Sequence, residues 1–161
     1  MTPEQAVARR RHYAERGRYS LMRRGSWADC DPAGTGYTPR FLGWCVEAVE
    51  QFFEEILEHP WQRLHADGIA APFASAQLDF HSPVHVGDRL LLMLSVPRIG
   101  GSSVSWAVVG SVADRRCFSG SAVSVFVDKT TFKPVHIPDR VRGRLRSPDE
   151  PASDTSHRRV E

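Results

Sequence analysis

The sequence predicts an α+β protein in which one long α-helix is followed by a run of antiparallel β-strands. Two patterns carry this prediction. Apolar residues recur at every third or fourth position from Phe41 to Ile56, which is typical of an amphipathic helix with one buried face. From about residue 73 to residue 127, runs rich in apolar and β-branched residues alternate with turn formers, which indicates hairpin-connected strands. A sheet that packs against the helix satisfies both patterns.

The length of 161 residues, with 41% hydrophobic and 25% charged residues, fits one domain that can bury a core. We expect this domain to span residues 19–141. Residues 1–18 are predicted to be a basic N-terminal arm, because a run of three arginines favours solvation although a short helix could form. Residues 142–161 are polar and contain prolines, so we expect a disordered tail.

The composition argues against several classes of partner. Cationic residues of the core are scattered rather than interleaved with aromatic residues, so no nucleic acid is expected. The three cysteines lack a paired spacing, and neither a disulfide framework nor a metal site is indicated. The sequence shows no signal peptide and no apolar run long enough to cross a membrane, so we expect a cytoplasmic protein without membrane contact.

The first elements follow from turn formers and prolines. A short strand is expected from about Tyr19 to Ala28, and residues 29–36 form a loop. Pro39 suits the first turn of the long helix, with Thr38 as its N-cap residue. The helix is expected to end just before Pro60, because a proline disfavours helical geometry in the residue that precedes it.

The remaining elements are a connecting segment and four strands. Trp61 to Gly68 is expected to connect the helix to the sheet. Glycines, prolines and an Asp-Arg pair then divide the chain into strands over about Phe73–His81, Arg89–Val96, Ser102–Val112 and Arg116–Val127. The last three strands are expected to form consecutive antiparallel hairpins.

Two acidic residues, Asp29 and Asp31, lie in the turn before the predicted helix. The free N–H groups of a first helical turn and the positive end of the helix dipole stabilise developing negative charge, so a carboxylate there can carry chemistry. The alternative is that either carboxylate caps the turn or accepts hydrogen bonds from the backbone. The spacing alone leaves both interpretations open.

Two stretches of the sequence together match a known enzyme pattern. They comprise residues 29–34 (Asp-Cys-Asp-Pro-Ala-Gly), Tyr37, Pro39, Phe41, Trp44 and residues 80–88 (Phe-His-Ser-Pro-Val-His-Val-Gly-Asp). This pattern, within a likeness from about Ser20 to about Asp139, resembles the 4-hydroxybenzoyl-CoA thioesterase family. The resemblance implies the hot-dog fold, an antiparallel sheet wrapped around one long central helix, and hydrolysis of an acyl-CoA thioester to a free acid and coenzyme A. It also implies no metal or redox cofactor, coenzyme A being part of the substrate, and a homodimer or homotetramer.

The resemblance assigns roles to individual residues. Asp31 matches the catalytic carboxylate, which acts as nucleophile on the thioester carbonyl or as general base for a water. The backbone N–H of Thr38 is expected to polarise the thioester oxygen. Tyr37 and Trp61 are candidate substrate-binding residues, with core packing as the alternative, and Trp61 favours an aromatic acyl group. Asp29 is expected to be a structural hydrogen-bond acceptor.

The sequence departs from the family at one predicted hairpin turn. A close relative carries an Arg-Arg-Lys-Ser run there that contacts the nucleotide of coenzyme A, whereas this chain has small residues. Glycine-bearing loops let phosphates approach backbone N–H groups, so these residues are candidates for binding substrate. They are Gly100, Gly101, Ser102 and Ser103, with Arg98 or the terminal arginines as compensating cations.

Three other site chemistries have less support. Cys30 has no histidine at a recognisable spacing. Glu47 and Glu50 fit a solvated helix face better than a helix-borne nucleophile. His81 and His85 lack a carboxylate or cysteine at metal-ligand spacing.

The sequence therefore predicts an acyl-CoA thioesterase that favours an aromatic, hydroxybenzoyl-like acyl group. Within the same chemistry, the alternatives are a thioesterase for acyl carrier protein or for another acyl-CoA such as dihydroxynaphthoyl-CoA. Outside it, the alternatives are a non-catalytic acyl-CoA-binding module of the same fold and a hot-dog dehydratase, which would need an acid and a histidine acting together.

Overall fold

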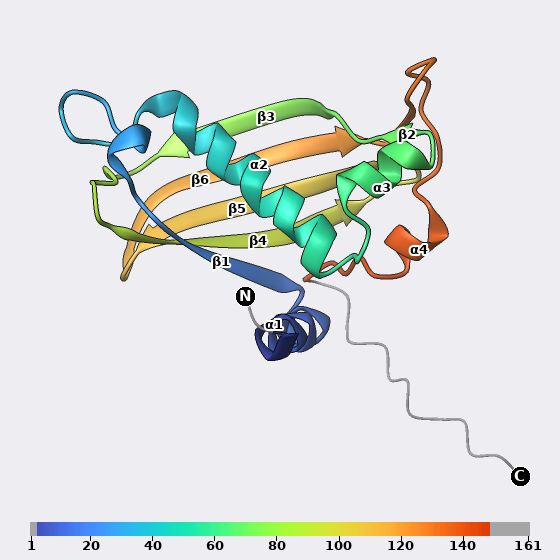
Figure 1. Ribbon diagram of the computed structural model, residues 1–161, viewed down its shortest axis with the longest axis horizontal. Coiled ribbons are helices and arrows are strands. Elements are labelled where there is room, and N and C mark those ends of the chain that lie inside the picture. Colours follow the sequence, from blue (N-terminus) through green and yellow to red (C-terminus); the bar gives the residue numbers. More distant parts are fainter. Residues whose placement is uncertain (1–2, 149–161) are drawn as a thin grey trace, which may run out of the picture.

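The protein folds as an antiparallel β-sheet that curves around a central helix (Figure 1). The computed structural model describes residues 3–148. Five strands follow the order β1-β4-β5-β6-β3, and β2 pairs with β7 in a separate small sheet. The elements are α1 Pro3–Arg16, β1 Arg18–Arg24, the 3-10 helix η1 Trp27–Asp29, α2 Thr38–Glu55, α3 Trp61–Ala66, β2 Ile69–Ala70, β3 Phe73–Phe80, β4 Arg89–Ile99, β5 Ser103–Val112, β6 Arg115–Val125, β7 Val127–Asp128 and α4 Asp139–Arg142. The predicted α+β class is confirmed.

The central helix α2 has 18 residues and is about 27 Å long. Its buried residues follow the predicted stripe and are Phe41, Trp44, Cys45, Ala48, Val49, Phe52 and Phe53. The helix begins at Thr38 and its N-cap residue is Tyr37, so the prediction of Thr38 as the N-cap is wrong by one residue. It ends at Glu55, earlier than predicted, and Glu58 has a positive φ of 50°, which turns the chain before it reaches Pro60.

The first strand is shorter than predicted. β1 stops at Arg24 because the next residue, Gly25, leaves the sheet and donates its N–H to the carbonyl of Asp88 at 2.9 Å. Residues Trp27–Asp29 then form a turn of 3-10 helix. The segment after β1 is therefore a folded loop that leads directly to Asp31.

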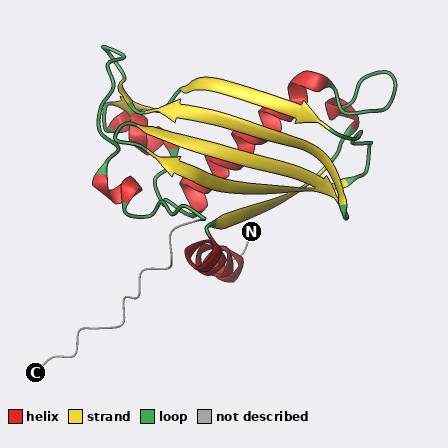
Figure 2. Cartoon of the chain, turned by 180° about the vertical axis from the view of Figure 1, so that it is seen from behind, coloured by secondary structure: helices red, strands yellow, loops and turns green. Residues whose placement is uncertain are grey.

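The two faces of the sheet differ in what packs against them. Residues of β4 alternate between buried and half-buried, and the buried set, Leu90, Leu92, Leu94 and Val96, faces the helix side. On the opposite face, no helix of residues 3–148 covers the strands (Figure 2). The core of the described chain is thus a single layer between α2 and one face of the sheet.

The strand directions define two ends of the molecule. At one, which we call the Asp31 end, β1 and β3 finish and β4 begins; at the other, the Trp61 end, β4 turns into β5 beside α3 and α4 (Figure 1). Within the described chain, β3 pairs only with β6, so its other edge is unpaired. β3 is mostly exposed and has no proline or lysine to blunt this edge.

The prediction of a solvated N-terminal arm is wrong for part of the segment. Residues Pro3–Arg16 form α1, and Tyr13 is only 2% exposed, with its ring 4.9 Å from that of Phe52. Arg9 pairs with Glu55 of α2 at 2.9 Å. Arg10 also forms an ion pair with Glu58, so one aromatic side chain and two ion pairs hold an otherwise polar helix on the domain.

The predicted tail is also ordered at its start. Leu145 is 2% exposed, and the backbone N–H of Arg146 donates to the Tyr13 hydroxyl at 2.8 Å. Residues 149–161 of that predicted tail lie outside the described residues. No helix in the described part of the chain is long and apolar enough to cross a membrane.

Candidate active site

The carboxylate of Asp31 is held in a fixed orientation by its own loop. Its Oδ1 atom accepts hydrogen bonds from the backbone N–H of Ala33 at 2.9 Å and of Thr35 at 3.3 Å. The Thr35 hydroxyl donates to either carboxylate oxygen, at 3.3 Å from each. Asp31 is half-buried, and among described residues only this hydroxyl donates a hydrogen bond to its Oδ2 atom. One carboxylate oxygen therefore remains available to a substrate or a water.

The loop is anchored at both ends. The N–H of Asp31 donates to the carbonyl of Thr35 at 2.8 Å, and the N–H of Gly36 donates to the carbonyl of Val84 at 2.8 Å. A Cβ atom on Gly36 would lie 2.9 Å from the ring of Phe41, so only glycine lets the loop sit this close to α2. The position of Asp31 is thus tied to the first buried side chain of the helix.

Thr35 is a site residue that the sequence analysis missed. Its hydroxyl and its N–H both serve Asp31, which makes it a positioning residue for the carboxylate. The available signal was an Asp followed four residues later by a Thr within a loop of turn formers, because short polar side chains there bond to one another and to the backbone.

The N-terminus of α2 lacks a side-chain cap. Tyr37, the N-cap residue, makes no capping hydrogen bond with its side chain, and Pro39 occupies the first turn. In this first turn the N–H of Arg40 donates to the carbonyl of Tyr37 at 2.8 Å, whereas the N–H of Thr38 is one of the leading donors that have no acceptor within the helix. Such donors, with the helix dipole, can stabilise an oxyanion. Tyr37 is 53% exposed, so its side chain is not part of the core of the described chain.

Asp29 is structural, in line with its expected role. Its Oδ2 accepts hydrogen bonds from the N–H of Ser26 at 3.0 Å, the Ser26 hydroxyl at 2.6 Å and the Arg23 guanidinium at 3.0 Å. Burial alone would raise the pKa of Asp29, but the Ser26 hydrogen bonds and the charge of Arg23 outweigh it and lower the pKa below its ordinary value. Asp29 is therefore an ionised part of the scaffold under the loop.

Other candidate groups near the loop are poorly placed for chemistry. Burial, followed by the charges of Asp29 and Asp31, raises the pKa of the Cys30 thiol, which disfavours a reactive thiolate. Glu47 forms an ion pair with Arg23. Residues 3–148 contain no group of three or more His, Cys, Asp and Glu side chains that could hold a metal ion.

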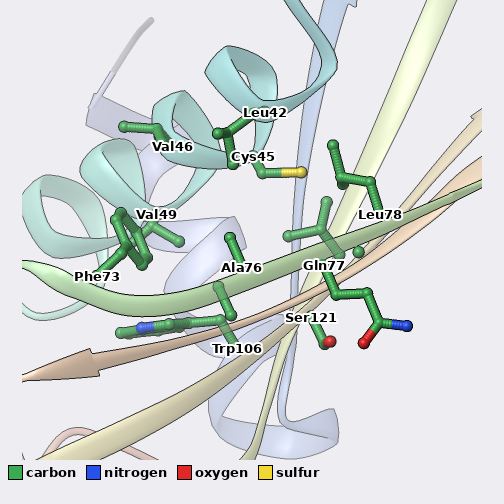
Figure 3. A pocket seen from close by; sticks show the side chains of 13 residues that line it. Leu42, Cys45, Val46, Val49, Phe73, Ala76, Gln77, Leu78, Trp106 and Ser121 are labelled. Carbon is green, nitrogen blue, oxygen red and sulfur yellow. The ribbon is translucent and has the colours of Figure 1, made fainter. Parts of the chain in front are cut away.

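A small apolar cavity of about 20 Å³ lies between α2 and the strands β3, β5 and β6 (Figure 3). It is lined by Leu42, Cys45, Val46, Val49, Phe73, Ala76, Gln77, Leu78, Trp106, Val108, Gly120, Ser121 and Ala122. A cavity needs about 10–15 Å³ to hold one water, so this one is too small for an aromatic ring. Burial raises the pKa of Cys45 to about 12, so its thiol stays neutral here.

A wider hollow of about 450 Å³ opens at the Trp61 end and shares Val46 and Phe73 with the small cavity. Its other lining residues are Trp61, Leu64, His65, Ile69, Ala70, Ala71, Pro72 and Phe132. The ring of Trp61 lies 6.0 Å from that of Phe53, and its indole N–H is buried without an acceptor among the described residues. Trp61 therefore borders an apolar hollow large enough for a fused aromatic ring.

The hairpin of residues 100–103 also lies at the Trp61 end, and its backbone is engaged within the chain. The hydrogen bonds run from the Gly100 N–H to the Ser103 carbonyl (2.8 Å), from the Phe126 N–H to the Ser102 carbonyl (2.7 Å), from the Ile137 N–H to the Gly101 carbonyl (2.9 Å) and from the Arg142 guanidinium to the Gly100 carbonyl (2.5 Å). The 11 residues of β4 span about 36 Å between this hairpin and the Asp31 end.

One chain thus brings some predicted site residues together and separates others. Asp31, Tyr37 and Thr38 share the Asp31 end, whereas Trp61 and the 100–103 hairpin lie at the opposite end. The Asp31 end also exposes several large apolar side chains. They are Trp27, Tyr37, Leu42 and Phe80, which are 77%, 53%, 42% and 51% exposed. An apolar surface around a candidate catalytic loop is typical of a site that another molecule covers.

An antiparallel sheet wrapped around one central helix, with a carboxylate loop before that helix, places the chain in the class of hot-dog proteins. Residues 26–145 match the family model of the Thioesterase-like superfamily, and the chain belongs to that superfamily. The hot-dog fold and the assignment as a thioester hydrolase are confirmed.

The similar proteins include several named as 1,4-dihydroxy-2-naphthoyl-CoA hydrolases. The protein from Synechococcus sp. strain CC9605 is 30% identical over 75% of this chain and 85% of its own length. The protein from Nostoc punctiforme is 26% identical over 88% of this chain and 95% of its own length. The crystal structure of a 1,4-dihydroxy-2-naphthoyl-CoA thioesterase from Synechocystis is 25% identical, with a TM-score of 0.75, and covers 88% of this chain and 100% of its own.

Proposed function

We propose that this protein hydrolyses a hydroxylated aromatic acyl-CoA thioester and that Asp31 is its catalytic carboxylate. The observation that carries the proposal is the orientation of Asp31 in the loop before an uncapped helix N-terminus. Its Oδ1 accepts two backbone hydrogen bonds, whereas its Oδ2 accepts only the Thr35 hydroxyl within residues 3–148. The backbone N–H of Thr38 is the proposed donor to the thioester oxygen as it gains negative charge.

Two routes fit this geometry. In the first, the Asp31 carboxylate attacks the thioester carbonyl carbon, the C–S bond breaks, and the thiolate leaves and takes up a proton; water then hydrolyses the acyl-aspartyl anhydride. In the second, Asp31 takes a proton from a water whose oxygen attacks the carbonyl carbon, and that proton passes to the leaving sulfur. Each route consumes one water and yields one acid and one coenzyme A thiol.

The hollow at the Trp61 end supports an aromatic acyl group. Its walls include the rings of Trp61, Phe73 and Phe132, and flat aromatic faces pack well against an aryl group. The buried indole N–H of Trp61 lacks an acceptor in the described chain, and a ring hydroxyl would supply one. The names of the similar proteins make 1,4-dihydroxy-2-naphthoyl-CoA the first substrate to test, and 4-hydroxybenzoyl-CoA is the single-ring alternative.

A second copy of the chain would unite the two halves of this site. If the free edge of β3 pairs with the same edge of a second chain about a two-fold axis, the Phe80 end of one β3 lies beside the Phe73 end of the other. The Asp31 loop of one copy then approaches the Trp61 hollow of its partner. We therefore propose a homodimer as the active unit, and a homotetramer built from such dimers.

The first experiment measures thiol release from 1,4-dihydroxy-2-naphthoyl-CoA, 4-hydroxybenzoyl-CoA and short- and long-chain acyl-CoA esters, with acyl carrier protein thioesters for comparison. Aryl-CoA esters should be the best substrates. Asp31→Asn, a near-isosteric change that removes the charge, should abolish turnover while the circular dichroism spectrum stays unchanged. Full activity of that variant would remove Asp31 from the mechanism.

Subunit complementation tests the shared site. Asp31→Asn inactivates the loop, and Ala71→Trp fills the hollow. After the two inactive variants are unfolded and refolded together, about a quarter of wild-type activity should return, because half of the random dimers are mixed and each mixed dimer has one intact site of two. If the mixture stays inactive while mixed dimers form, the site is not shared.

The cytoplasmic location and the absence of a cofactor remain predictions from the sequence. The binding role of Gly100, Gly101, Ser102 and Ser103 is likewise a prediction from the sequence.

A further inference from the structure

Two arginines lie directly opposite each other at the Asp31 end of the sheet. Arg24 closes β1, Arg89 opens β4, and the antiparallel register pairs them. Both side chains are exposed, and neither forms an ion pair within the described chain. Like charges that face each other across two strands destabilise a sheet, and no ion pair within residues 3–148 offsets the repulsion between these two arginines.

Nearby charged groups are engaged elsewhere. Asp88 accepts a hydrogen bond from the N–H of His85 at 2.8 Å and lies 3.9 Å from the guanidinium of Arg115. The guanidinium of Arg23 is bonded to Asp29. A surface hollow remains beside the pair, lined by Met22, Arg23, Arg24, Gly87 and Arg89. Two arginines thus border this hollow without a counter-ion from the described chain.

Backbone hydrogen bonds tie this hollow to the catalytic loop. Gly87 donates its N–H to the carbonyl of Gly25 at 2.9 Å, which fixes the turn of residues 85–88 to the end of β1. On its other side the same turn contacts the loop of Asp31, because His85 forms an isolated β-bridge with Thr35. The arginine pair and the Asp31 carboxylate therefore lie at a fixed separation on two sides of one turn.

We propose that Arg24 and Arg89 bind the phosphate groups of the coenzyme A moiety while the thioester lies at Asp31. This inference rests on the proposed function. In coenzyme A an extended pantetheine arm separates the thioester sulfur from the phosphates, so a phosphate site must stand apart from the carboxylate, as the arginine pair does. Paired guanidinium groups match phosphate oxygens with charge-assisted, bidentate hydrogen bonds. The phosphates also supply the negative charge that the sheet lacks at this point.

Binding of coenzyme A and of pantetheine, which has no phosphate, tests the proposal without relying on turnover. By isothermal titration calorimetry, Arg24→Gln and Arg89→Gln should each weaken binding of coenzyme A by about tenfold, the usual effect of losing one charge-assisted hydrogen bond. Pantetheine binding should not change. Arg116→Gln is the matched control, because Arg116 is an exposed arginine of the same sheet that lies on β6 opposite Ser111, and this variant should bind coenzyme A like the wild type.

Two further readouts complete the test. The Arg24 and Arg89 variants should raise KM for an aryl-CoA ester but not for the matching N-acetylcysteamine thioester, which lacks phosphates, and their melting temperatures should equal or exceed that of the wild type. If coenzyme A binding is unchanged, or falls together with pantetheine binding, the proposal is overturned and the phosphates bind elsewhere, for example at the 100–103 hairpin. Failure of the Asp31 mechanism would appear instead as turnover in Asp31→Asn with calorimetric binding intact.

Discussion

The side chain of Tyr13 and the backbone of Arg146 form two hydrogen bonds with each other across 133 residues. The Tyr13 hydroxyl donates to the carbonyl of Arg146 at 3.0 Å and accepts the N–H of the same residue at 2.8 Å. The two segments that the sequence analysis assigned to a free arm and a free tail are therefore joined to one another at the surface of the domain.

Replacement of Tyr13 by Phe keeps the ring that packs on Phe52 and removes both of these hydrogen bonds. We expect the free energy of unfolding to fall by about 1–2 kcal/mol, because the backbone groups of Arg146 lose their partner in a half-buried place. Urea denaturation measures the change. Tyr37→Phe is the control, since Tyr37 is exposed and should stay within about 0.5 kcal/mol of the wild type.

Replacement of Thr35 by Val removes the hydroxyl that orients Asp31 and keeps the size of the side chain. We expect kcat to fall by about tenfold or more while KM changes little, because the carboxylate loses its alignment and not its charge. Steady-state kinetics with the best aryl-CoA ester provides the measurement. Thr35→Ser restores the hydroxyl and should recover most of kcat; if Thr35→Val keeps the wild-type kcat, Thr35 does not position Asp31.

Replacement by alanine should change the stability of the fold in opposite directions at two glycines. A Cβ atom on Gly110 would lie 2.0 Å from the ring of Phe118, so Gly110→Ala should destabilise the fold by about 1–3 kcal/mol through overpacking. Gly43 lies in α2, and apart from its neighbours and the backbone of its own helix no atom of the described chain lies within 4 Å of such a Cβ, so Gly43→Ala should stabilise by about 0.5–1 kcal/mol. Thermal and urea denaturation of both variants check the sign of each change.

The contribution of Asp29 to the free energy of unfolding should depend on pH. Its pKa is lower in the folded chain than the ordinary value of about 3.9, so the ionised form is favoured by folding. The stabilisation is present above that ordinary value and is lost as the pH falls through the folded-state pKa. Asp29→Asn should therefore be less stable than the wild type at pH 7, and the two should converge on acidification. If the difference in stability between the wild type and Asp29→Asn stays constant down to about pH 2, well below the ordinary pKa, ionisation of Asp29 is not the cause of the stabilisation.

Local patterns in the sequence were sufficient for the main elements. The stripe from Phe41 to Ile56 predicted the buried face of α2, and the strands β4, β5 and β6 agree with their predicted ranges to within a few residues. These elements could be predicted because the periodicity of their apolar residues lies within one short, continuous stretch of sequence. The motif around Asp31 likewise identified the loop that the structure places before the helix.

The features that the sequence did not predict depend on distant partners. Burial of Tyr13 requires Phe52 and Arg146, which no local pattern connects to residues 1–18. The arginine pair exists only because β1 and β4 are neighbours, which follows from sheet order rather than from either strand. The separation of the Asp31 loop from the Trp61 hollow is also a property of strand direction. Contacts of this kind appear only when the chain is folded.

The contacts that hold α1 on the domain lie in a region where thermal stability can be increased without loss of activity. Arg10, Arg144 and Glu58 form ion pairs beside the Tyr13 hydrogen bonds, away from the loop of Asp31. Because effects of well-separated substitutions are usually additive, thermostabilising changes in this region should combine freely with changes that retune the acyl preference. The fold thus offers one region in which stability can be selected and another in which specificity can be selected, with little trade-off between them.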